Sequence, residues 1–263
     1  MPDNVQIMNL NMNASLSGGY SSASQIARVL TEQWVSDNMF CPRCGNANIN
    51  HFNNNRPVAD FYCPECGSQY ELKSKNGKSI DIVNDGSYST MIERILSSDN
   101  PDFFFMLYAK TNWSVNDFFF VPKHFFTPKI IQMRKPLSPD ARRAGWVGCN
   151  ILVNSIPATG RIPIVENGKE VDKKDVLQKV SVADSLFIKD MNARGWLFDV
   201  LSCVEEVKGP VFALSDIYRY EQKLSMLHPN NHNVQAKIRQ QLQLLRDRGI
   251  IEFTKRGEYR KIL

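Results

Sequence analysis

The sequence predicts an α/β protein of two domains, in which the first holds an embedded four-cysteine zinc site and the second is a C-terminal α+β winged helix. Three observations lead to this architecture. The chain has 263 residues, enough for about two domains of ordinary size. Two C-P-x-C-G segments lie close together in its first third. The pattern of apolar residues changes near residue 190, so we expect domains at 1–189 and 190–263.

The composition is that of a folded protein without a membrane anchor. Hydrophobic residues make up 43% of the chain, which is enough to build packed cores. No run of about 18 apolar residues is present, so no membrane-spanning helix is expected. Met1 to Leu16 lack the basic and apolar regions of a secretion signal, and we therefore expect a cytoplasmic protein.

Positive charge is concentrated in two stretches. The net charge is +5. Residues 121–146 hold six Lys/Arg against one acidic residue, and residues 233–263 hold eight against three, so the rest of the chain is slightly acidic. Two concentrated basic stretches favour a polyanionic partner such as nucleic acid. Two solvated faces would explain the same charges.

The first part of the chain predicts a helix and short strands around the cysteines. Residues 1–20 are rich in Asn, Ser and Gly and indicate a flexible lead. Apolar residues at three- and four-residue steps predict a helix over Ser21–Asp37. Short strands are expected at Val58–Tyr62 and Gln69–Lys73, followed by a helix from about Ser87 to Leu96.

Two strongly apolar strands follow, Asp102–Ala109 and Asp117–Val121, with a polar turn between them. Residues 122–150 are rich in Pro and basic residues and predict mostly loop, ending in a strand at Val147–Leu152. Residues 166–185 carry mixed charge and include Asn167-Gly168, which is typical of a turn.

From about residue 190 the elements follow the order of a winged helix: helix, short strand, two helices and a hairpin. Ser215 is the expected N-cap of the second helix, and Gly249 is expected to end the third. The predicted bounds are Gly195–Val207, Phe212–Leu214, Ser215 to about Leu227, Asn233–Arg248, Ile250–Phe253 and Glu258–Ile262.

The two cysteine pairs predict a structural metal site. Cys41 and Cys44 are separated from Cys63 and Cys66 by 18 residues, and Gly follows each pair, which allows backbone amides to turn toward the sulfurs. Four thiolates satisfy tetrahedral Zn²⁺ and leave no open position, so this metal is not expected to do chemistry. Iron is the alternative metal. The two remaining cysteines, at positions 149 and 203, are expected to be buried thiols.

A carboxylate–lysine group lies beside the second cysteine pair. Asp60 follows Arg56-Pro57-Val58-Ala59, and Glu71-Leu72-Lys73 lies in the next predicted strand. The two-residue period of a strand places Glu71 and Lys73 on one face. Two carboxylates suit a hard divalent cation, and a lysine beside it can orient water or offset phosphate charge. A solvent-facing Asp and an exposed Glu/Lys face are the alternative. Glu32 is either a third acid or a surface residue.

At these residues the chain resembles the DpnI-type restriction endonucleases. The similarity runs from about Ala27 to the C-terminus and involves several motifs at once. They are residues 51–63 (HFNNNRPVADFYC), 70–75 (YELKSK), 84–86 (NDG), 134–137 (RKPL), 141–146 (ARRAGW) and 238–242 (IRQQL). Residues 1–20 and 165–190 match less well.

The resemblance implies a PD-(D/E)XK nuclease core with an embedded zinc site, followed by a winged helix. It implies a type II enzyme that cleaves double-stranded DNA at GATC when the adenine is methylated, and that requires Mg²⁺. By motif position, Asp60, Glu71 and Lys73 carry over as the catalytic set, with the Leu72 main chain as a further Mg²⁺ ligand, and the four paired cysteines carry over as zinc ligands. We expect a monomer in solution.

Two groups of residues are candidates for contacting DNA. On the outer side of the third C-terminal helix, polar residues suit base edges, since Arg matches guanine and Asn or Gln matches adenine. These residues are Asn233, Gln235, Lys237, Arg239 and Gln240, and Lys255, Arg256 and Arg260 on the wing suit phosphates. In the first domain, Arg142 and Arg143 accompany Trp146, whose ring is expected either to pack in a core or to stack at a base step.

Three functions compete on the sequence. The first is the methyl-directed endonuclease, and the second is a non-catalytic zinc-ribbon and winged-helix regulator of DNA. The third is a repair or recombination nuclease that recognises DNA structure. Asp60 and Glu71 beside Lys73 disfavour a regulator, which has no need of metal-binding acids. The side-chain-rich recognition helix favours reading of sequence over reading of structure.

Overall fold

A computed structural model describes residues 8–52, 59–97 and 99–262. The chain forms two compact units. The N-terminal unit consists of Met1–Ser155 and Arg161–Val180, and the C-terminal unit consists of Ile156–Gly160 and Ser181–Leu263. None of the described helices combines the length and apolar character needed to cross a bilayer.

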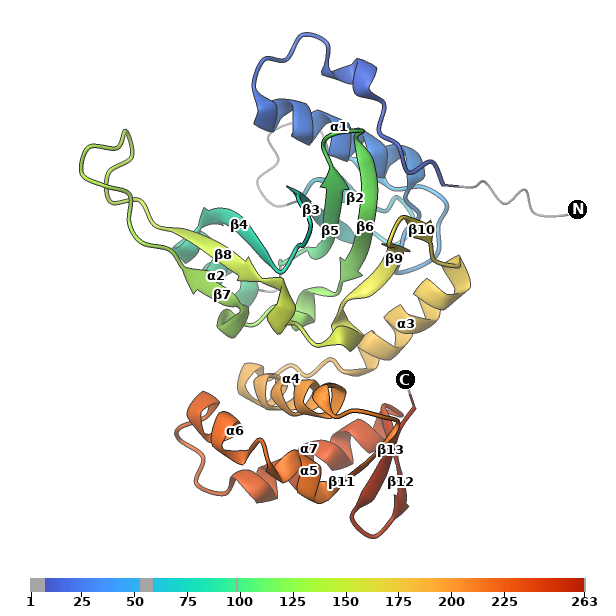
Figure 1. The fold of residues 1–263 in the computed structure, drawn as a ribbon, viewed down its shortest axis with the longest axis vertical. Helices are drawn as coiled ribbons and strands as arrows, with labels where there is room; N and C mark the ends of the chain where they lie inside the picture. The colour runs from blue at the N-terminus through green and yellow to red at the C-terminus, as the bar shows by residue number, and fades with distance from the viewer. Residues whose placement is uncertain (1–7, 53–58, 98, 263) are drawn as a thin grey trace, which may run out of the picture. The chain divides into compact units, whose positions relative to one another are not determined.

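The N-terminal unit is built on a seven-stranded sheet with the order β1-β2-β3-β5-β6-β9-β10 (Figure 1). The β3–β5 pair is parallel, and the other neighbouring strands are antiparallel. The strands are β1 (Asn50–His51), β2 (Phe61–Tyr62), β3 (Gln69–Asn76), β5 (Asp102–Ala109), β6 (Ser114–Val121), β9 (Ile162–Glu166) and β10 (Lys169–Glu170). The predicted strand at 58–62 reduces to β2, since Val58 lies outside the described residues, and β9 and β10 were not predicted.

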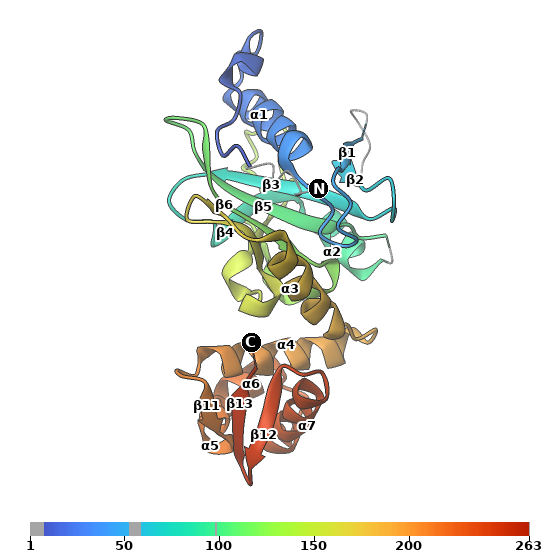
Figure 2. The same cartoon turned by 90° about the vertical axis from the view of Figure 1, so that its right-hand side faces the viewer.

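The two predicted apolar strands are β5 and β6, which lie in the interior of the sheet order, and β6 begins earlier than expected, at Ser114. The sheet is covered on both faces. The helix α1 (Ala23–Asn38) lies over one face (Figure 1, Figure 2). There Trp34 meets Phe118 edge-on, with ring centroids 5.3 Å apart. On the other, Phe126 stacks on Phe103 with ring centroids 3.9 Å apart. Burial on both faces explains why β5 is a continuous apolar run.

A second sheet has the order β4-β8-β7, with β4 at Ile82–Ser87, β7 at Ile131–Met133 and β8 at Gly148–Leu152. The helix α2 (Tyr88–Leu96) follows β4, and Ser87 caps its first turn, which confirms the predicted helix. The prediction that 122–150 is mostly loop missed β7 and two short 3₁₀ helices, Lys123–Phe125 and Pro128–Ile130. The connection from β7 to β8 extends beyond both strands (Figure 1).

The prediction of a flexible lead is wrong for the described residues 8–20. Met12 N–H donates to the Trp113 carbonyl at 2.8 Å, and Val115 N–H donates to Leu10 at 2.9 Å. The Trp34 indole donates to the Asn9 carbonyl at 2.7 Å. A 3₁₀ helix follows at Ala14–Ser17. These residues form main-chain hydrogen bonds with the start of β6, and such bonds do not depend on side-chain type. The polar composition of the segment therefore did not indicate that it has a defined structure.

The C-terminal unit has the predicted winged-helix order, with its hairpin beside α7 (Figure 2). Its elements are α4 (Met191–Glu206), β11 (Val211–Ala213), α5 (Leu214–Tyr218), α6 (Glu221–Leu227), α7 (Val234–Asp247), β12 (Ile251–Lys255) and β13 (Glu258–Lys261). The strands pair in the order β11-β13-β12. The helix α3 (Lys173–Ser185), which was not predicted, precedes them.

One predicted helix of this unit is wrong in two respects. The chain forms α5 and α6 rather than a single helix to Leu227, with a break at Arg219 and Tyr220. The N-cap is Ala213, not Ser215, because Asp216 accepts a hydrogen bond from the Ala213 N–H at 2.9 Å. Gly249 has φ of 72° and directly follows the α7 C-cap, which fits its predicted role in ending that helix.

A short segment between β8 and β9 belongs to the C-terminal unit. Glu205 of α4 accepts hydrogen bonds from the Ala158 and Thr159 N–H groups at 2.7 and 2.9 Å, and from the Thr159 hydroxyl at 2.7 Å. The same carboxylate therefore binds three donors of the 3₁₀ turn Ala158–Gly160.

The first cysteine pair is fastened to β5 by an ion pair. Two guanidinium nitrogens of Arg43 donate to the two Asp102 oxygens at 2.8 and 2.7 Å, and Asp102 also accepts from the Lys123 N–H at 2.8 Å. The side chain of Asp102 is only 5% exposed. Bidentate pairing satisfies a carboxylate that burial alone would destabilise.

We predict that Asp102→Ala lowers the free energy of unfolding by about 3 kcal/mol, because it leaves Arg43 without its carboxylate in a largely buried place. Urea denaturation followed by tryptophan fluorescence measures this. The exposed neighbour Asp99 provides the control, and Asp99→Ala should change stability by less than about 0.5 kcal/mol. Equal stabilities for the two variants would contradict the importance of this ion pair.

Candidate functional site

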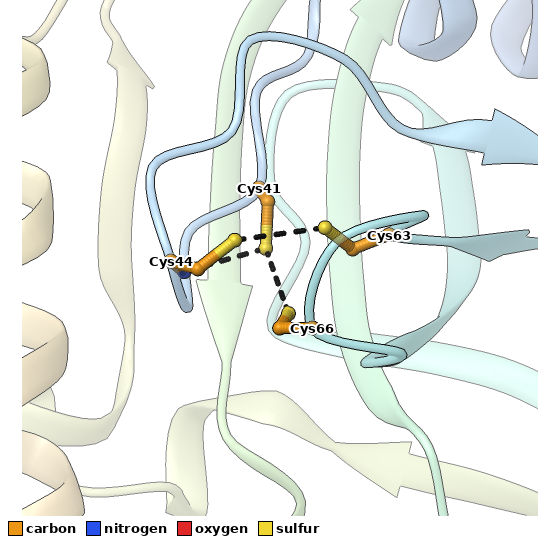
Figure 3. Close-up of side chains that lie close together, drawn as sticks. All are labelled: Cys41, Cys44, Cys63 and Cys66. Carbon is orange, nitrogen blue, oxygen red and sulfur yellow. Dashed lines mark hydrogen bonds between the residues drawn. The ribbon is translucent and has the colours of Figure 1, made fainter.

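Four cysteines from two separate turns converge on one point (Figure 3). The sulfur atoms of Cys41, Cys44, Cys63 and Cys66 all lie within 4.8 Å of one another. Cys41 and Cys66 sulfurs are 3.6 Å apart, as are those of Cys44 and Cys63. A tetrahedral zinc with bonds of about 2.3 Å has edges of about 3.8 Å, so this donor set fits zinc. Among the described residues, these cysteines are the group of three or more His, Cys, Asp or Glu side chains that lie close enough together to hold a metal.

The local backbone explains how each pair turns back on itself. Gly45 and Gly67 have φ of 77° and 71°, a region that favours glycine. The Gly45 N–H donates to the Cys41 carbonyl at 2.8 Å, and the Gly67 N–H donates to the Cys63 carbonyl at 3.0 Å. The Cys44 N–H also points to the Cys41 sulfur at 3.4 Å, as the glycine positions predict.

Burial raises the pKa of the Cys41 thiol to about 12. A bound cation would be needed to hold this sulfur as a thiolate at neutral pH. The other two cysteines, Cys149 and Cys203, are fully buried away from this cluster, as predicted.

Tyr70 joins the cysteine cluster to the strand that carries the acidic residues. Its hydroxyl lies 2.9 Å from the Cys41 sulfur, and its side chain is fully buried, which raises its pKa well above the usual range. Tyr70 pairs with Phe61 across β2 and β3, and its carbonyl accepts from the Asp60 N–H at 2.9 Å. Glu71 directly follows Tyr70 in β3. Because Tyr70 contacts both Cys41 and Asp60, it links the cysteine cluster to the position of Asp60 beside β3.

Asp60 directly precedes β2 and lies beside the edge of β3 that β2 pairs with. Its carboxylate accepts a hydrogen bond from the Leu72 N–H at 2.7 Å. Burial raises the pKa of Asp60, and the negative charges of Glu71 and Glu32 raise it further, against the hydrogen bond from Leu72. The Leu72 carbonyl shares the strand edge of its own N–H, so it points to the same side as Asp60.

Glu71 and Lys73 lie together on one face of β3, as the strand period predicts. Lys73 Nζ is 2.6 Å from a Glu71 oxygen and 2.6 Å from an Asp85 oxygen. The other Glu71 oxygen lies 2.6 Å from a guanidinium nitrogen of Arg94. Although burial alone would lower the pKa of Lys73, the two carboxylates raise it above its usual range.

Sequence reasoning missed Asp85 and Arg94 as members of this group. Asp85 comes from β4 and Arg94 from α2, and neither is close to the E-x-K segment along the chain. Asp85 lies within residues 84–86, one of the segments that carried the family resemblance, which was a usable signal. Nothing in the sequence distinguished Arg94 from an ordinary helix-surface arginine.

Glu32 reaches the same region from α1. It accepts hydrogen bonds from Arg28 at 2.7 Å and from His51 of β1 at 3.0 Å. Its charge acts on Asp60, as noted above, so it is not the isolated surface residue that the alternative expected. The segment Asn53–Val58, which includes the Arg56-Pro57 pair before Asp60, lies outside the described residues.

The acidic residues offer the oxygen ligands that a hard divalent cation prefers. Asp60, Glu71 and the Leu72 carbonyl form the candidate set. Its fit is supported by the raised pKa of Asp60, because burial and the nearby charges of Glu71 and Glu32 disfavour its carboxylate form and a cation would stabilise it. Lys73 contacts one Glu71 oxygen and Arg94 contacts the other. A cation that binds Glu71 would therefore have to share an oxygen with one of these two side chains or displace it.

The loop between β7 and β8 presents the first group of DNA-contact candidates. Arg142 and Arg143 are exposed, and the Arg143 guanidinium lies 4.5 Å from the centre of the Trp146 ring. Trp146 is partly exposed, and its ring lies against Gly148, where an added Cβ would approach within 2.8 Å. Trp146 is therefore not a core tryptophan, and its ring is held at the base of the loop.

The α7 candidates occupy the outer face that the apolar stripe predicted. Val234, Ile238, Leu242 and Leu245 are buried, whereas Asn233, Gln235, Arg239 and Gln240 are exposed. Lys237 is half-buried, with Nζ 6.0 Å from the centre of the Trp196 ring.

Several candidates already have partners within the unit. Gln235 donates to Glu221 at 2.7 Å, and Arg239 donates to the Tyr218 hydroxyl at 2.6 Å. On the wing, Lys255 lies 3.1 Å from Glu258, and Arg260 lies 2.8 Å from Glu252. Arg256 is exposed at the turn between β12 and β13. Contact with DNA by this group stays a prediction.

Two family models match the chain. One, described as DpnI, Dam-replacing family, matches residues 8–190. The other, described as the Dam-replacing HTH (helix-turn-helix) domain, matches residues 192–261. The first match contains the cysteine cluster and the Asp60–Glu71–Lys73 group, and the second contains the winged helix.

We predict that the purified chain contains one zinc ion and that Cys63→Ser lowers both zinc content and thermal stability. The cluster closes the turn between β2 and β3, and structural zinc sites contribute roughly 10 kcal/mol or more of binding free energy in small peptides. Elemental analysis and thermal melting measure the two effects. Cys203→Ala, at a buried cysteine outside the cluster, should lose stability but keep the metal. Iron in place of zinc, or no metal, would contradict the assignment.

Proposed function

This chain belongs to the Dam-replacing family of DpnI-type, methyl-directed restriction endonucleases, and on that premise we propose that it hydrolyses double-stranded DNA at GATC sites carrying methylated adenine, with Mg²⁺ as the catalytic cation. The N-terminal unit is then a PD-(D/E)XK nuclease core. Asp60 supplies the first acid, and Glu71-Leu72-Lys73 supplies the E-x-K segment. The chain is proposed to act as a monomer.

One observation carries this proposal above the others: Asp60 lies at the edge of β3 beside the ion pair that Glu71 and Lys73 form on that strand. Asp60 is hydrogen-bonded to Leu72, and Glu71 and Lys73 are paired on the neighbouring face at 2.6 Å. A regulator that only binds DNA would gain nothing from placing two largely buried carboxylates beside a lysine. Clustered groups with shifted pKa values are typical of catalytic sites.

In this proposal Asp60, Glu71 and the Leu72 carbonyl hold the divalent cation. When bound, the cation supplies Lewis-acid activation of the scissile phosphate and of a water molecule. Lys73, kept protonated by Glu71 and Asp85, donates hydrogen bonds to the phosphate oxygen on which charge accumulates or to the attacking water. Arg94 holds the second Glu71 oxygen and limits rotation of that carboxylate.

Two separate surfaces are proposed to read the methylated site. In the N-terminal unit, Arg142 and Arg143 contact phosphates while Trp146 offers a flat apolar face to the methylated base. In the C-terminal unit, α7 enters the major groove with Asn233, Gln235, Lys237, Arg239 and Gln240, and the wing contacts phosphates through Lys255, Arg256 and Arg260. Two readings of one methyl group are useful because one apolar pocket gives only about 1–3 kcal/mol of discrimination.

We predict that the chain cuts plasmid DNA from an adenine-methylating host, does so only with a divalent cation, and leaves unmethylated plasmid intact. Asp60→Ala should slow this cleavage by about a thousandfold, because a catalytic cation contributes several kcal/mol to transition-state stabilisation. Binding of methylated duplex in Ca²⁺, measured by fluorescence anisotropy, should change little.

The exposed acid Asp37 on α1 provides a matched control, and Asp37→Ala should cut at the wild-type rate. Cleavage of both plasmids alike would contradict methyl direction. Wild-type rates in Asp60→Ala would contradict the cation site, and cleavage that persists in a chelator would contradict metal dependence.

A second prediction concerns the two readers and uses the full chain carrying Asp60→Ala, which binds without cutting. Adding Trp146→Ala should reduce the preference for methylated over unmethylated GATC duplex by about tenfold. It should not abolish the preference, because α7 still reads the site. Arg142→Ala should instead weaken binding to both duplexes equally and reduce the salt dependence by about one unit. Equal affinities for the two duplexes after Trp146→Ala would leave α7 without a role in reading the methyl group.

A further inference from the structure

Lys73 sits between two carboxylates that come from different sheets. Its ammonium nitrogen lies 2.6 Å from Glu71 of β3 and 2.6 Å from Asp85 of β4. The side chains of Lys73 and Asp85 are each only 13% exposed. At such burial the two contacts are strong, and neither carboxylate is easily replaced by water.

Asp85 has little other use in the described structure. One of its oxygens accepts from Lys73, and the other is buried with no hydrogen-bond partner among the described residues. A buried carboxylate oxygen without a partner costs free energy, so its retention needs a reason. Holding a buried ammonium group is such a reason, since Lys73 would otherwise have Glu71 as its single carboxylate.

The position of Asp85 is set by its strand and not by Lys73. Asp85 pairs with the fully buried Cys149 across β4 and β8, next to an irregularity in the register between Asp85 and Ser87. The Tyr88 N–H donates to the Val147 carbonyl at 3.1 Å and continues the pairing beyond the irregularity. The carboxylate is therefore presented to Lys73 by a second sheet whose own hydrogen bonds hold it in place.

Glu71 is the point of competition. Lys73 contacts one of its oxygens and Arg94 the other, so a divalent cation that binds Glu71 must take the place of one donor. Lys73 has a second carboxylate at hydrogen-bond distance and a flexible stem, and it can leave Glu71 without becoming a buried, unpaired charge.

We infer that Asp85 is a positioning residue for Lys73, an inference that rests on the proposed function: Asp85 holds the ammonium group at the reaction centre when a divalent cation takes the Glu71 oxygen that Lys73 contacts. Without Asp85, Lys73 can only pair with Glu71 and competes with the cation for it. Asp85 touches neither the cation nor the DNA in this arrangement.

The test is a double-mutant cycle on the full chain, with Asp85→Asn, Lys73→Met and both together. Ca²⁺ is titrated calorimetrically into the complex with methylated GATC duplex, and single-turnover cleavage is measured at saturating Mg²⁺. Asp85→Asn should weaken Ca²⁺ binding roughly tenfold, as expected for the loss of one charge-assisted hydrogen bond, and should do so much less in the Lys73→Met chain. The double variant should cut no more slowly than Lys73→Met alone.

Asp81→Asn, the same change at an exposed acid just before β4, should alter neither measurement. If Asp85→Asn weakens Ca²⁺ binding equally in the wild-type and Lys73→Met chains, Asp85 acts as an independent charge or ligand. The same conclusion follows if the double variant cuts more slowly than Lys73→Met by the factor that Asp85→Asn alone produces. Either result overturns the inference and leaves the proposed function intact. A wild-type complex that binds no Ca²⁺ would overturn the proposed function, and this inference with it.

Discussion

The register of β2 against β3 is the constraint on which the candidate active site depends. Phe61 pairs with Tyr70, so Asp60 falls opposite the strand edge where Leu72 presents its N–H. Because side chains alternate along a strand, a slip of β2 by one residue would turn Phe61 to the opposite face of the sheet and move Asp60 away from the Leu72 N–H. The cysteines at both ends of this turn, with Tyr70 against Cys41, oppose such a slip. The cysteine cluster thus fixes the position of the candidate catalytic residues as well as supporting the fold.

The site is also a balance of charge. Glu71 and Asp85 face Lys73 and Arg94, so the four side chains together carry no net charge in a largely buried place. Low dielectric makes any unpaired member costly, and the group therefore persists without a cation. The DNA-contact candidates of the C-terminal unit show a related pattern, since Gln235, Arg239 and Arg260 are each paired within that unit. Under the proposed function, binding of a cation at the first place and of DNA at the second would exchange these internal partners for new ones.

The sequence predicted those parts of the molecule that depend on local pattern. The cysteine spacing, the continuous apolar run of β5 and the apolar stripe of α7 are each visible as a pattern within a short stretch of sequence. Asp85 and Arg94 were missed because their meeting with Glu71 and Lys73 depends on how β4 and α2 pack, which no local pattern specifies. The ordered segment after residue 8 was missed for the same reason, because its main-chain hydrogen bonds go to Trp113 and Val115, which lie far along the chain.

The turn at Ala158–Gly160 bears on how such a protein can evolve. It lies inside the first family match, between two strands of the N-terminal unit, yet it clusters with the C-terminal unit, where Glu205 binds it. The chain therefore passes between the units more than once, and the winged helix is not a simple appendage. A different winged helix joined after the nuclease core would leave the amides of this turn without their carboxylate. Exchange of specificity modules by recombination at a single joint is disfavoured, and change in recognition is expected to accumulate by substitution on the surface of the existing module.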